Sequence, residues 1–158
     1  MPVAIVKATA GDYENILPLY AEVHELHRSN LPWRFASLEN EVYSKAYFSE
    51  VIVDDNRLFL LAKDEGQVVG FATAKIEKSP DLEILQPRNF VLLNVLATAG
   101  GYRQQGIGTM LMAEVEKWAS EKGLSDIELN VWQFNQIAIE FYRRQGFEAV
   151  SQRMRKVL

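Results

Sequence analysis

The sequence predicts a single mixed α/β domain, with a central and mostly antiparallel sheet flanked by helices. Strand-like and helix-like segments follow one another in the order β, α, α, β, β, β, α, β, α, β. The chain has 158 residues, 48% of them hydrophobic, which suffices for one core. No repeat or linker divides it, so residues 1–158 are expected to form one domain.

Six segments have the β-branched and apolar composition of strands. In chain order they are residues 3–7, 58–63, 68–76, 90–98, 127–132 and 147–158. The turn signal Asp64-Glu65-Gly66-Gln67 joins the second and third segments into a hairpin. Residues 79–87 contain two prolines and are expected to form a loop. Residues 90–98 are almost all apolar, which predicts a central strand that is covered on both faces.

Four segments are expected to be helical. Thr9 stands three residues before Asp12, the pattern of a capping box that opens the first helix. After an aromatic loop at residues 29–37, Ser37 is expected to cap a second helix that runs through about Phe48. The fourth helix covers residues 135–145. The third ends at Gly123, and its expected buried face consists of Ile107, Met110, Leu111, Val115, Trp118 and Ala119.

The composition excludes several kinds of chemistry. Without cysteine there are no disulfides, thiolate metal sites or cysteine nucleophiles. The two histidines, His24 and His27, have a spacing that allows a shared metal, but no third ligand is evident. Packing at a helix end beside the aromatic loop is the preferred interpretation for both. We therefore expect no metal.

Charge and hydropathy also limit the partners. A net charge of −4 and a pI near 5.3 disfavour broad nucleic-acid binding. The N-terminus has no basic region before an apolar run, and the most apolar stretch is too short to cross a bilayer. These features predict a cytoplasmic protein without nucleic-acid or membrane partners.

A glycine-rich turn, Tyr102-Arg103-Gln104-Gln105-Gly106-Ile107-Gly108-Thr109, follows the 90–98 strand and opens the third helix. Such a helix start presents unpaired N–H groups to an anion. A P-loop would need Lys and Ser or Thr where Ile107 and Gly108 stand, and a dinucleotide fingerprint would need glycine at Leu111. Two interpretations remain: a plain strand–helix turn, or a site that holds a pyrophosphate without cutting it.

A second motif follows, Asn135-x-x-Ala138-x-x-Phe141-Tyr142-x-x-x-Gly146-Phe147. Together with Arg103-x-x-Gly106-x-Gly108 it closely resembles the GNAT acetyltransferase superfamily, whose members transfer acyl groups from coenzyme A. The resemblance covers residues 90–147 firmly, whereas the N-terminal half matches only in the order of its elements. It implies acetyl-CoA as co-substrate and a sheet whose fourth and fifth strands splay apart at a bulge.

The resemblance also implies residue roles. Leu96 and Thr98, with Ala97 between them, match the strand positions that pair with the pantetheine arm. Asn135 matches the side chain that hydrogen-bonds this arm, although it can also be a plain helix cap. Tyr142 matches the tyrosine that protonates the departing thiolate, although it can also be a plain core aromatic. The pyrophosphate would be held by Arg103, Gln104, Gln105, Gly106, Ile107, Gly108 and Thr109.

The implied reaction is direct attack on the acetyl thioester by a primary amine of a small molecule or peptide. A backbone N–H near Leu96 would stabilise the oxyanion. Asn94 stands where the family often has an acidic residue, and an asparagine cannot serve as the base. A water relay, Glu77, Glu128 or His27 are the alternatives.

Three other interpretations of the activity stay open. The enzyme could use another acyl group or a protein N-terminus, or the chain could be an acyl-CoA-binding sensor with weak or no catalysis.

The roles of other residues also stay open. Trp33, Phe35 and Tyr43 are equally compatible with an acceptor pocket and with a satellite core. Since dimers through the C-terminal strand are common in the family, a homodimer is a further expectation, and Arg153, Arg155 and Lys156 are expected on a solvated strand face.

Overall fold

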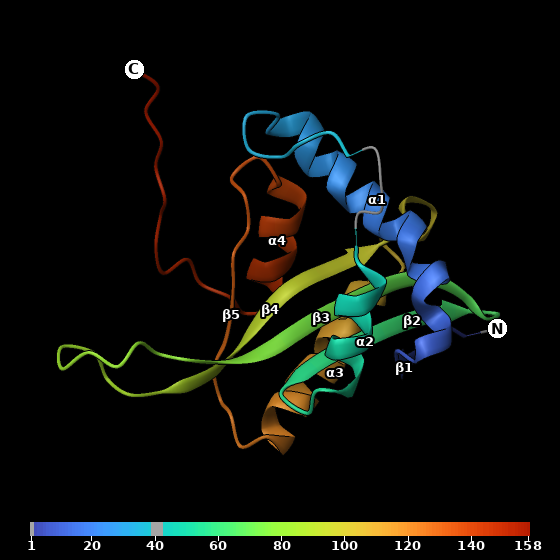
Figure 1. Ribbon diagram of the computed structural model, residues 1–158, viewed down its shortest axis with the longest axis horizontal. Coiled ribbons are helices and arrows are strands. Elements are labelled where there is room, and N and C mark those ends of the chain that lie inside the picture. Colours follow the sequence, from blue (N-terminus) through green and yellow to red (C-terminus); the bar gives the residue numbers. More distant parts are fainter. Residues whose placement is uncertain (1, 39–42) are drawn as a thin grey trace.

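The computed structural model describes residues 2–38 and 43–158 and contains one five-stranded sheet (Figure 1). The strands lie in chain order, and all neighbours are antiparallel except the last pair, in which the fifth strand runs parallel to the fourth. The predicted mixed and mostly antiparallel sheet is thus confirmed. The strands are β1 (Ala4–Lys7), β2 (Arg57–Asp64), β3 (Gln67–Lys78), β4 (Asn89–Thr98) and β5 (Ile127–Leu129).

Helices cover both faces of the sheet. α1 (Tyr13–Asn30) and α2 (Lys45–Val53) pack on one face, around buried residues such as Ile16 and Phe71. α3 (Ile107–Glu121) packs on the other face, and α4 (Gln136–Arg144) lies beside it. None of the described helices combines the length and apolar character that a membrane crossing requires.

The hairpin between β2 and β3 follows the turn signal in the sequence. Glu65 and Gly66 both have positive φ angles, 48° and 85°, and they separate the paired residues Asp64 and Gln67. Two positive φ angles in a two-residue loop match the right-handed twist of the flanking strands. The predicted hairpin is therefore confirmed.

The capping box at the start of the first helical segment is also confirmed, and it extends into the sheet. The Thr9 N–H donates to Asp12 Oδ2 at 2.8 Å, while Lys63 Nζ of β2 donates to Asp12 Oδ1 at 2.6 Å. Asp12 is 4% exposed, so its charge depends on these partners. The same carboxylate thus caps the helix and ties it to β2.

The second helix was predicted in the wrong place. α2 begins at Lys45, where the Ser44 hydroxyl accepts a hydrogen bond from the Tyr47 N–H. Ser37 is exposed and starts no helix, and residues 39–42 of the predicted helix lie outside the described part of the chain. The later start places Phe48 and Val51 against β2 and the core.

The strand predictions need three corrections. β3, rather than the 90–98 run, is the middle strand of the sheet. β4 pairs with β5 over only three residues, and most of its side chains are only partly buried. β5 ends at Leu129, short of the predicted 132. Residues 148–158 are exposed and form no strand, since no described strand pairs with them. Figure 1 shows this tail outside the sheet, and its Arg155 guanidinium lies 3.9 Å from the ring centroid of Trp33.

The predicted buried face of the third helix is correct except at one position. Met110 is 39% exposed, whereas Met112 is fully buried. Leu111 and Met112 face the sheet together with Val115, while Met110 lies at the margin of the buried stripe. The helix ends before Gly123, whose φ is 72°.

We expect Asp12→Asn to lower the free energy of unfolding by about 1–3 kcal/mol at pH 7, because it breaks charge-assisted hydrogen bonds. Burial alone would raise the pKa of Asp12, but the hydrogen bonds from Lys63 and Thr9 hold it below its usual value of 3.8. The stabilisation is therefore present above that value and is lost as the pH falls through the lower, folded-state pKa. Urea unfolding of both proteins should show the difference shrinking as the pH falls below about 4. A pH-independent difference would contradict this assignment.

Candidate active site

The candidate site begins where β4 and β5 part. β5 pairs with β4 only at Val91, Leu92 and Leu93. On the other side, Thr73 pairs with Val95 and Ala74 with Leu93, which leaves Asn94 as the extra residue of a β-bulge. Beyond the bulge, no described strand pairs with β4 on its β5 side. The expected bulge and splayed strands are present.

The backbone of β4 presents polar groups to this gap. The Ala99 N–H donates to Val69 O of β3 at 2.9 Å. Because backbone polar groups alternate sides along a strand, Val95 and Ala97 also face β3, and Leu96 and Thr98 face the gap. These groups of Leu96 and Thr98 have no strand partner among the described residues, although the Thr98 C=O accepts a long hydrogen bond from Arg103 Nε at 3.5 Å, so the gap offers backbone groups to an extended ligand.

The glycine-rich turn closes one end of the gap. Gln104 and Gly106 have positive φ angles of 61° and 81°, and a left-handed conformation is uncommon for a residue such as glutamine. Gln105 Nε2 braces the turn by donating to Gly101 O at 3.2 Å. Such a strained and braced conformation is typical of functional turns.

The first turn of α3 leaves N–H groups free of helical partners. Met110 is the first residue whose N–H donates within this helix, to Gly106 O at 3.0 Å. The N–H groups of residues 107–109 precede it and have no helical acceptor. The Ile107 side chain is 2% exposed and belongs to the core, so only its backbone can meet a ligand. This arrangement can bind an anion such as a pyrophosphate.

α4 packs directly on this first turn of α3. A Cβ atom at Gly108 would lie 3.1 Å from Phe141 Cζ, tighter than ordinary contact. Gln145 Nε2, at the end of α4, donates to Thr109 Oγ1 at 3.2 Å. Gly108 therefore allows the close approach of two helices, a packing role that its place in the turn motif did not reveal.

Asn135 and Tyr142 lie at the two ends of α4. Asn135 Oδ1 accepts from the Ala138 N–H at 3.2 Å, so Asn135 caps the helix and its amide NH₂ stays available. The Tyr142 ring packs between Phe141 and Phe147, with centroids 5.4 and 5.6 Å apart. Burial raises the pKa of Tyr142 to about 12, so its hydroxyl keeps its proton at neutral pH.

On the α1 side of the sheet, aromatic rings join distant segments. Tyr20 stacks on Phe71 and on Tyr43, with centroids 4.5 and 4.4 Å apart. Phe35 packs near His27 at 5.3 Å and Trp132 at 5.8 Å. These contacts place Phe35 and Tyr43 in clusters of aromatic rings, an arrangement that a satellite core and the wall of an acceptor pocket share. Trp33 is 51% exposed, with the Arg155 guanidinium 3.9 Å from its ring centroid.

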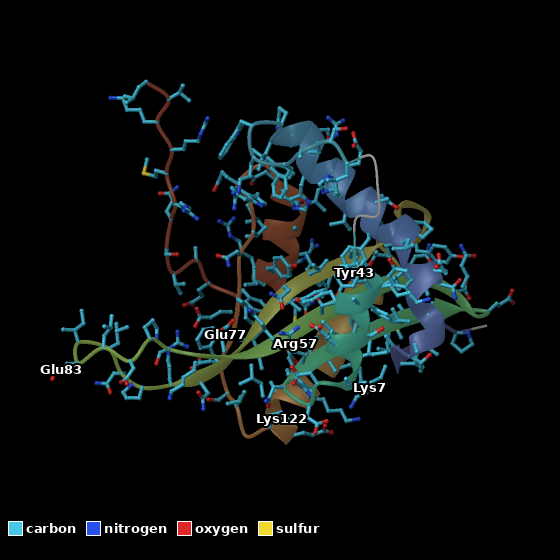
Figure 2. All side chains as sticks on the ribbon, in the orientation of Figure 1. Lys7, Tyr43, Arg57, Glu77, Glu83 and Lys122 are labelled. Atoms are coloured by element: carbon cyan, nitrogen blue, oxygen red, sulfur yellow. The ribbon has the colours of Figure 1, made fainter. Side chains whose placement is uncertain are left out.

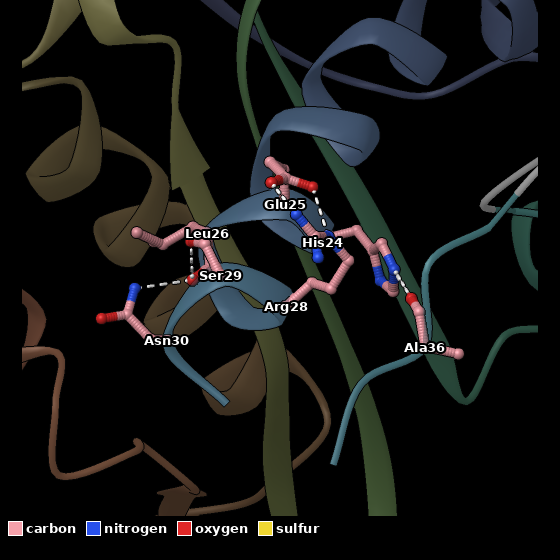
Figure 3. A network of polar contacts seen from close by, with 7 residues as sticks. All are labelled: His24, Glu25, Leu26, Arg28, Ser29, Asn30 and Ala36. Atoms are coloured by element: carbon pink, nitrogen blue, oxygen red, sulfur yellow. Dashed lines mark hydrogen bonds and ion pairs between the residues drawn. The ribbon is translucent and has the colours of Figure 1, made fainter. Parts of the chain in front are cut away.

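Both histidines bond to main-chain carbonyls. His24 Nε2 lies 2.8 Å from Ala36 O (Figure 3). His27 Nδ1 lies 2.8 Å from Val23 O. A carbonyl only accepts, so each of these nitrogens carries a hydrogen. The contacts support the interpretation of helix-end histidines beside the aromatic loop, and they leave His27 Nε2 free as an acceptor.

The other candidate bases are held in ion pairs. Glu77 lies 2.6 Å from Lys75 Nζ, and Glu128 pairs with Arg88. Asn94 is exposed at the bulge. Burial raises the pKa of Tyr20, and it raises that of Tyr43 to about 12, so neither tyrosine serves as a base near neutral pH.

Comparison with known proteins identifies the class. The acetyltransferase (GNAT) family model matches residues 20–147, and the chain belongs to this family. It is an acetyltransferase, and the family uses acetyl-CoA.

Among its relatives is an uncharacterized N-acetyltransferase of Mycobacterium tuberculosis, 32% identical over 74% of this chain and 69% of the relative. The crystal structure of a mutant Bacillus halodurans protein has 26% sequence identity to this chain and superposes on it with a TM-score of 0.93. The match covers 98% of this chain and 99% of the Bacillus halodurans chain. An aminoglycoside N-acetyltransferase in complex with CoA shares the fold at 19% identity and a TM-score of 0.75, covering 98% of each chain.

We expect Gly108→Ala to destabilise the protein by up to about 2 kcal/mol. Alanine favours a helix over glycine by about 1 kcal/mol, but overpacking against Phe141 costs about 1–3 kcal/mol. Urea unfolding measures the net change.

Two matched variants test the cause. Gly101→Ala, in the same turn, should be nearly neutral, because no described atom lies within 4 Å of its new Cβ. In a Phe141→Leu background, Gly108→Ala should cease to destabilise. An equal loss in both backgrounds would show that the Phe141 contact is not the cause.

Proposed function

We propose that this protein transfers the acetyl group of acetyl-CoA directly to a primary amine of a small molecule or peptide, with residues 1–158 acting as one domain. The observation that carries the proposal is the gap between β4 and β5. It combines free backbone groups on one strand with a helix N-terminus at one end and with α4, which bears Asn135 and Tyr142.

The residues along the gap suit the parts of coenzyme A. The N–H groups at the start of α3 and the turn from Arg103 to Gly106 would bind the pyrophosphate. Leu96 and Thr98 would pair with the amides of the pantetheine arm as a neighbouring strand does, with Ala97 between them facing β3. The free NH₂ of Asn135 would donate to a pantetheine carbonyl.

The acetyl transfer needs a stabilised oxyanion and a stabilised leaving group. As the amine nitrogen bonds to the acetyl carbon, the carbonyl oxygen becomes an oxyanion that the N–H near Leu96 can stabilise. The C–S bond then breaks and the sulfur leaves as a thiolate. A thiol has a pKa of about 8.5, below the value of about 12 for Tyr142, so the tyrosine holds its proton more tightly than the thiolate would. Tyr142 therefore stabilises the leaving sulfur mainly by donating a hydrogen bond to it, rather than by transferring its proton before the C–S bond breaks.

The amine must lose a proton before or during its attack, because amines of this kind are mostly protonated at neutral pH. Asn94 can orient a water molecule at the bulge but cannot take the proton. A water relay therefore serves this step, with His27 Nε2 as the acceptor that its Nδ1 hydrogen bond leaves free.

Titration calorimetry with acetyl-CoA and free CoA tests the proposal, followed by an amine screen that detects released thiol. Micromolar binding with amine-dependent thiol release supports it. Binding without turnover on any amine would favour the second candidate, an acyl-CoA-binding sensor, which the exposed Asn94 at the position of an acid suggests. No binding of either compound would contradict both.

Tyr142→Phe should lower kcat by about ten- to a hundredfold and leave CoA affinity nearly unchanged, because a hydrogen bond to the departing sulfur contributes less than the roughly 10²–10⁴-fold of a full general acid. Steady-state kinetics and calorimetry measure the two quantities separately. Phe147→Leu is a control that alters the packing of the Tyr142 ring without removing its hydroxyl. Unaltered turnover in Tyr142→Phe would show that Tyr142 is not the hydrogen-bond donor to sulfur.

We also propose that two copies of the chain form a homodimer. The β3–β4 loop, residues 79–87, projects from the sheet with Glu83 at its tip (Figure 2). Its Leu82 and Ile84 are 55% and 90% exposed, and its charges are both acidic, Asp81 and Glu83. Exposed apolar projections of this kind favour association.

The tail, residues 148–158, has the complementary character. Val150 and Met154 are 85% and 83% exposed, and three of its four charged side chains are basic. Arg155 lies against Trp33 of its own chain, which leaves Arg153 and Lys156 for a partner. The acidic loop of one copy can therefore receive these two basic residues of the other, and a twofold axis repeats the contact.

Light scattering after size exclusion should show a dimer at micromolar concentrations. Asp81→Lys with Glu83→Lys should dissociate it, and adding Arg153→Glu with Lys156→Glu should restore it. Glu50→Lys with Glu116→Lys, at exposed helical positions, should leave it intact. A monomeric wild-type protein, or a dimer that the loop charges do not affect, would contradict the proposed contact.

A further inference from the structure

One ion pair connects the glycine-rich turn to a helix on the opposite face of the sheet. Arg103 Nη2 lies 3.2 Å from Glu22 Oε1 of α1, and the two residues are 81 positions apart. The same carboxylate oxygen lies 3.5 Å from where a Cβ of Gly100 would stand. A negative charge therefore borders the turn that, under the proposed function, receives the pyrophosphate.

The pair is weak enough to exchange for a ligand. The Arg103 and Glu22 side chains are 55% and 44% exposed, and exposed ion pairs are individually weak. A pyrophosphate carries more negative charge and can accept two parallel N–H bonds from a guanidinium. It therefore competes for Arg103, and the Glu22 carboxylate must turn away because like charges repel.

The Arg103 side chain also has a second contact, which keeps its guanidinium beside the turn. Its Nε lies 3.5 Å from Thr98 O, a carbonyl that faces the gap. With Glu22 on one side and Thr98 on the other, the guanidinium lies beside both the turn and the strand that the pantetheine arm would follow. Glu22 thus holds the Arg103 guanidinium close to its proposed ligand-binding position and, at the same time, pairs with its positive charge.

We infer that Glu22 is a positioning residue that competes with the pyrophosphate of coenzyme A for Arg103, weakens cofactor binding and speeds the release of the product CoA. This inference rests on the proposed function. Glu22 lies on α1, which also carries Tyr20, His24 and His27. Each exchange of Arg103 between carboxylate and pyrophosphate therefore makes or breaks a contact between the cofactor turn and this helix.

The test compares CoA binding to the wild-type protein, Glu22→Gln and Glu25→Gln by calorimetry. We expect Glu22→Gln to bind CoA about five- to twentyfold more tightly and to release it more slowly, because a negative charge near the ligand is removed. Structural damage would weaken binding instead. Glu25 lies one turn further along α1 and pairs with Arg28, so Glu25→Gln removes the same charge away from the turn and should change little (Figure 3).

Two further measurements assign the effect to Arg103 and to the pyrophosphate. In an Arg103→Gln background, Glu22→Gln should have a much smaller effect. S-acetylpantetheine, which lacks the pyrophosphate, should react equally well with wild type and Glu22→Gln.

The outcomes separate the inference from the proposed function. If wild type binds CoA and Glu22→Gln binds it equally, or if the effect keeps its full size without Arg103, the inference is overturned and the proposed function stands. If neither protein binds CoA, the proposed function fails, and the inference fails with it.

Discussion

The extra residue at Asn94 is the constraint on which the rest of the site depends. A regular β4 would continue its pairing with β5, and the polar groups of Leu96 and Thr98 would be bonded within the sheet. The bulge ends that pairing at Leu93 and leaves an open strand edge inside the protein. An open edge is a ready template for an extended partner, which here is the proposed pantetheine arm.

The two ends of the gap are held in place by helix packing. α3 begins directly at the turn, and α4 rests on its first turn because Gly108 has no side chain to hold Phe141 away. The hydrogen bond from Gln145 to Thr109 fixes the same two helices at a second point. The N–H groups proposed to bind the pyrophosphate and Tyr142 therefore belong to one packed unit, although the two motifs are separated by a strand.

Local patterns in the sequence predicted most of the elements. The capping box at Thr9, the hairpin at residues 64–67 and the cap at Asn135 each depend on residues within about four positions of one another, so propensity and spacing suffice. The predictions of the second helix and of the last strand were wrong because these elements depend on partners that are distant in the sequence. Ser37 and Ser44 are both residues that can cap a helix, and the packing of Phe48 against the core selects the later start at Ser44. Residues 148–158 have a strand-like composition without a described strand to pair with.

The sequence by itself determined the family, the glycine-rich turn and the identity of the candidate site residues, because motifs require particular residue types at short, set spacings. Only the tertiary structure decided that Lys63 pairs with Asp12, that Gly108 leaves room for the Phe141 ring, and that Glu22 contacts Arg103, 81 positions away in the sequence. Such contacts depend on how packed elements cross in space. No local pattern encodes that geometry, because each partner alone is an ordinary charged or small residue.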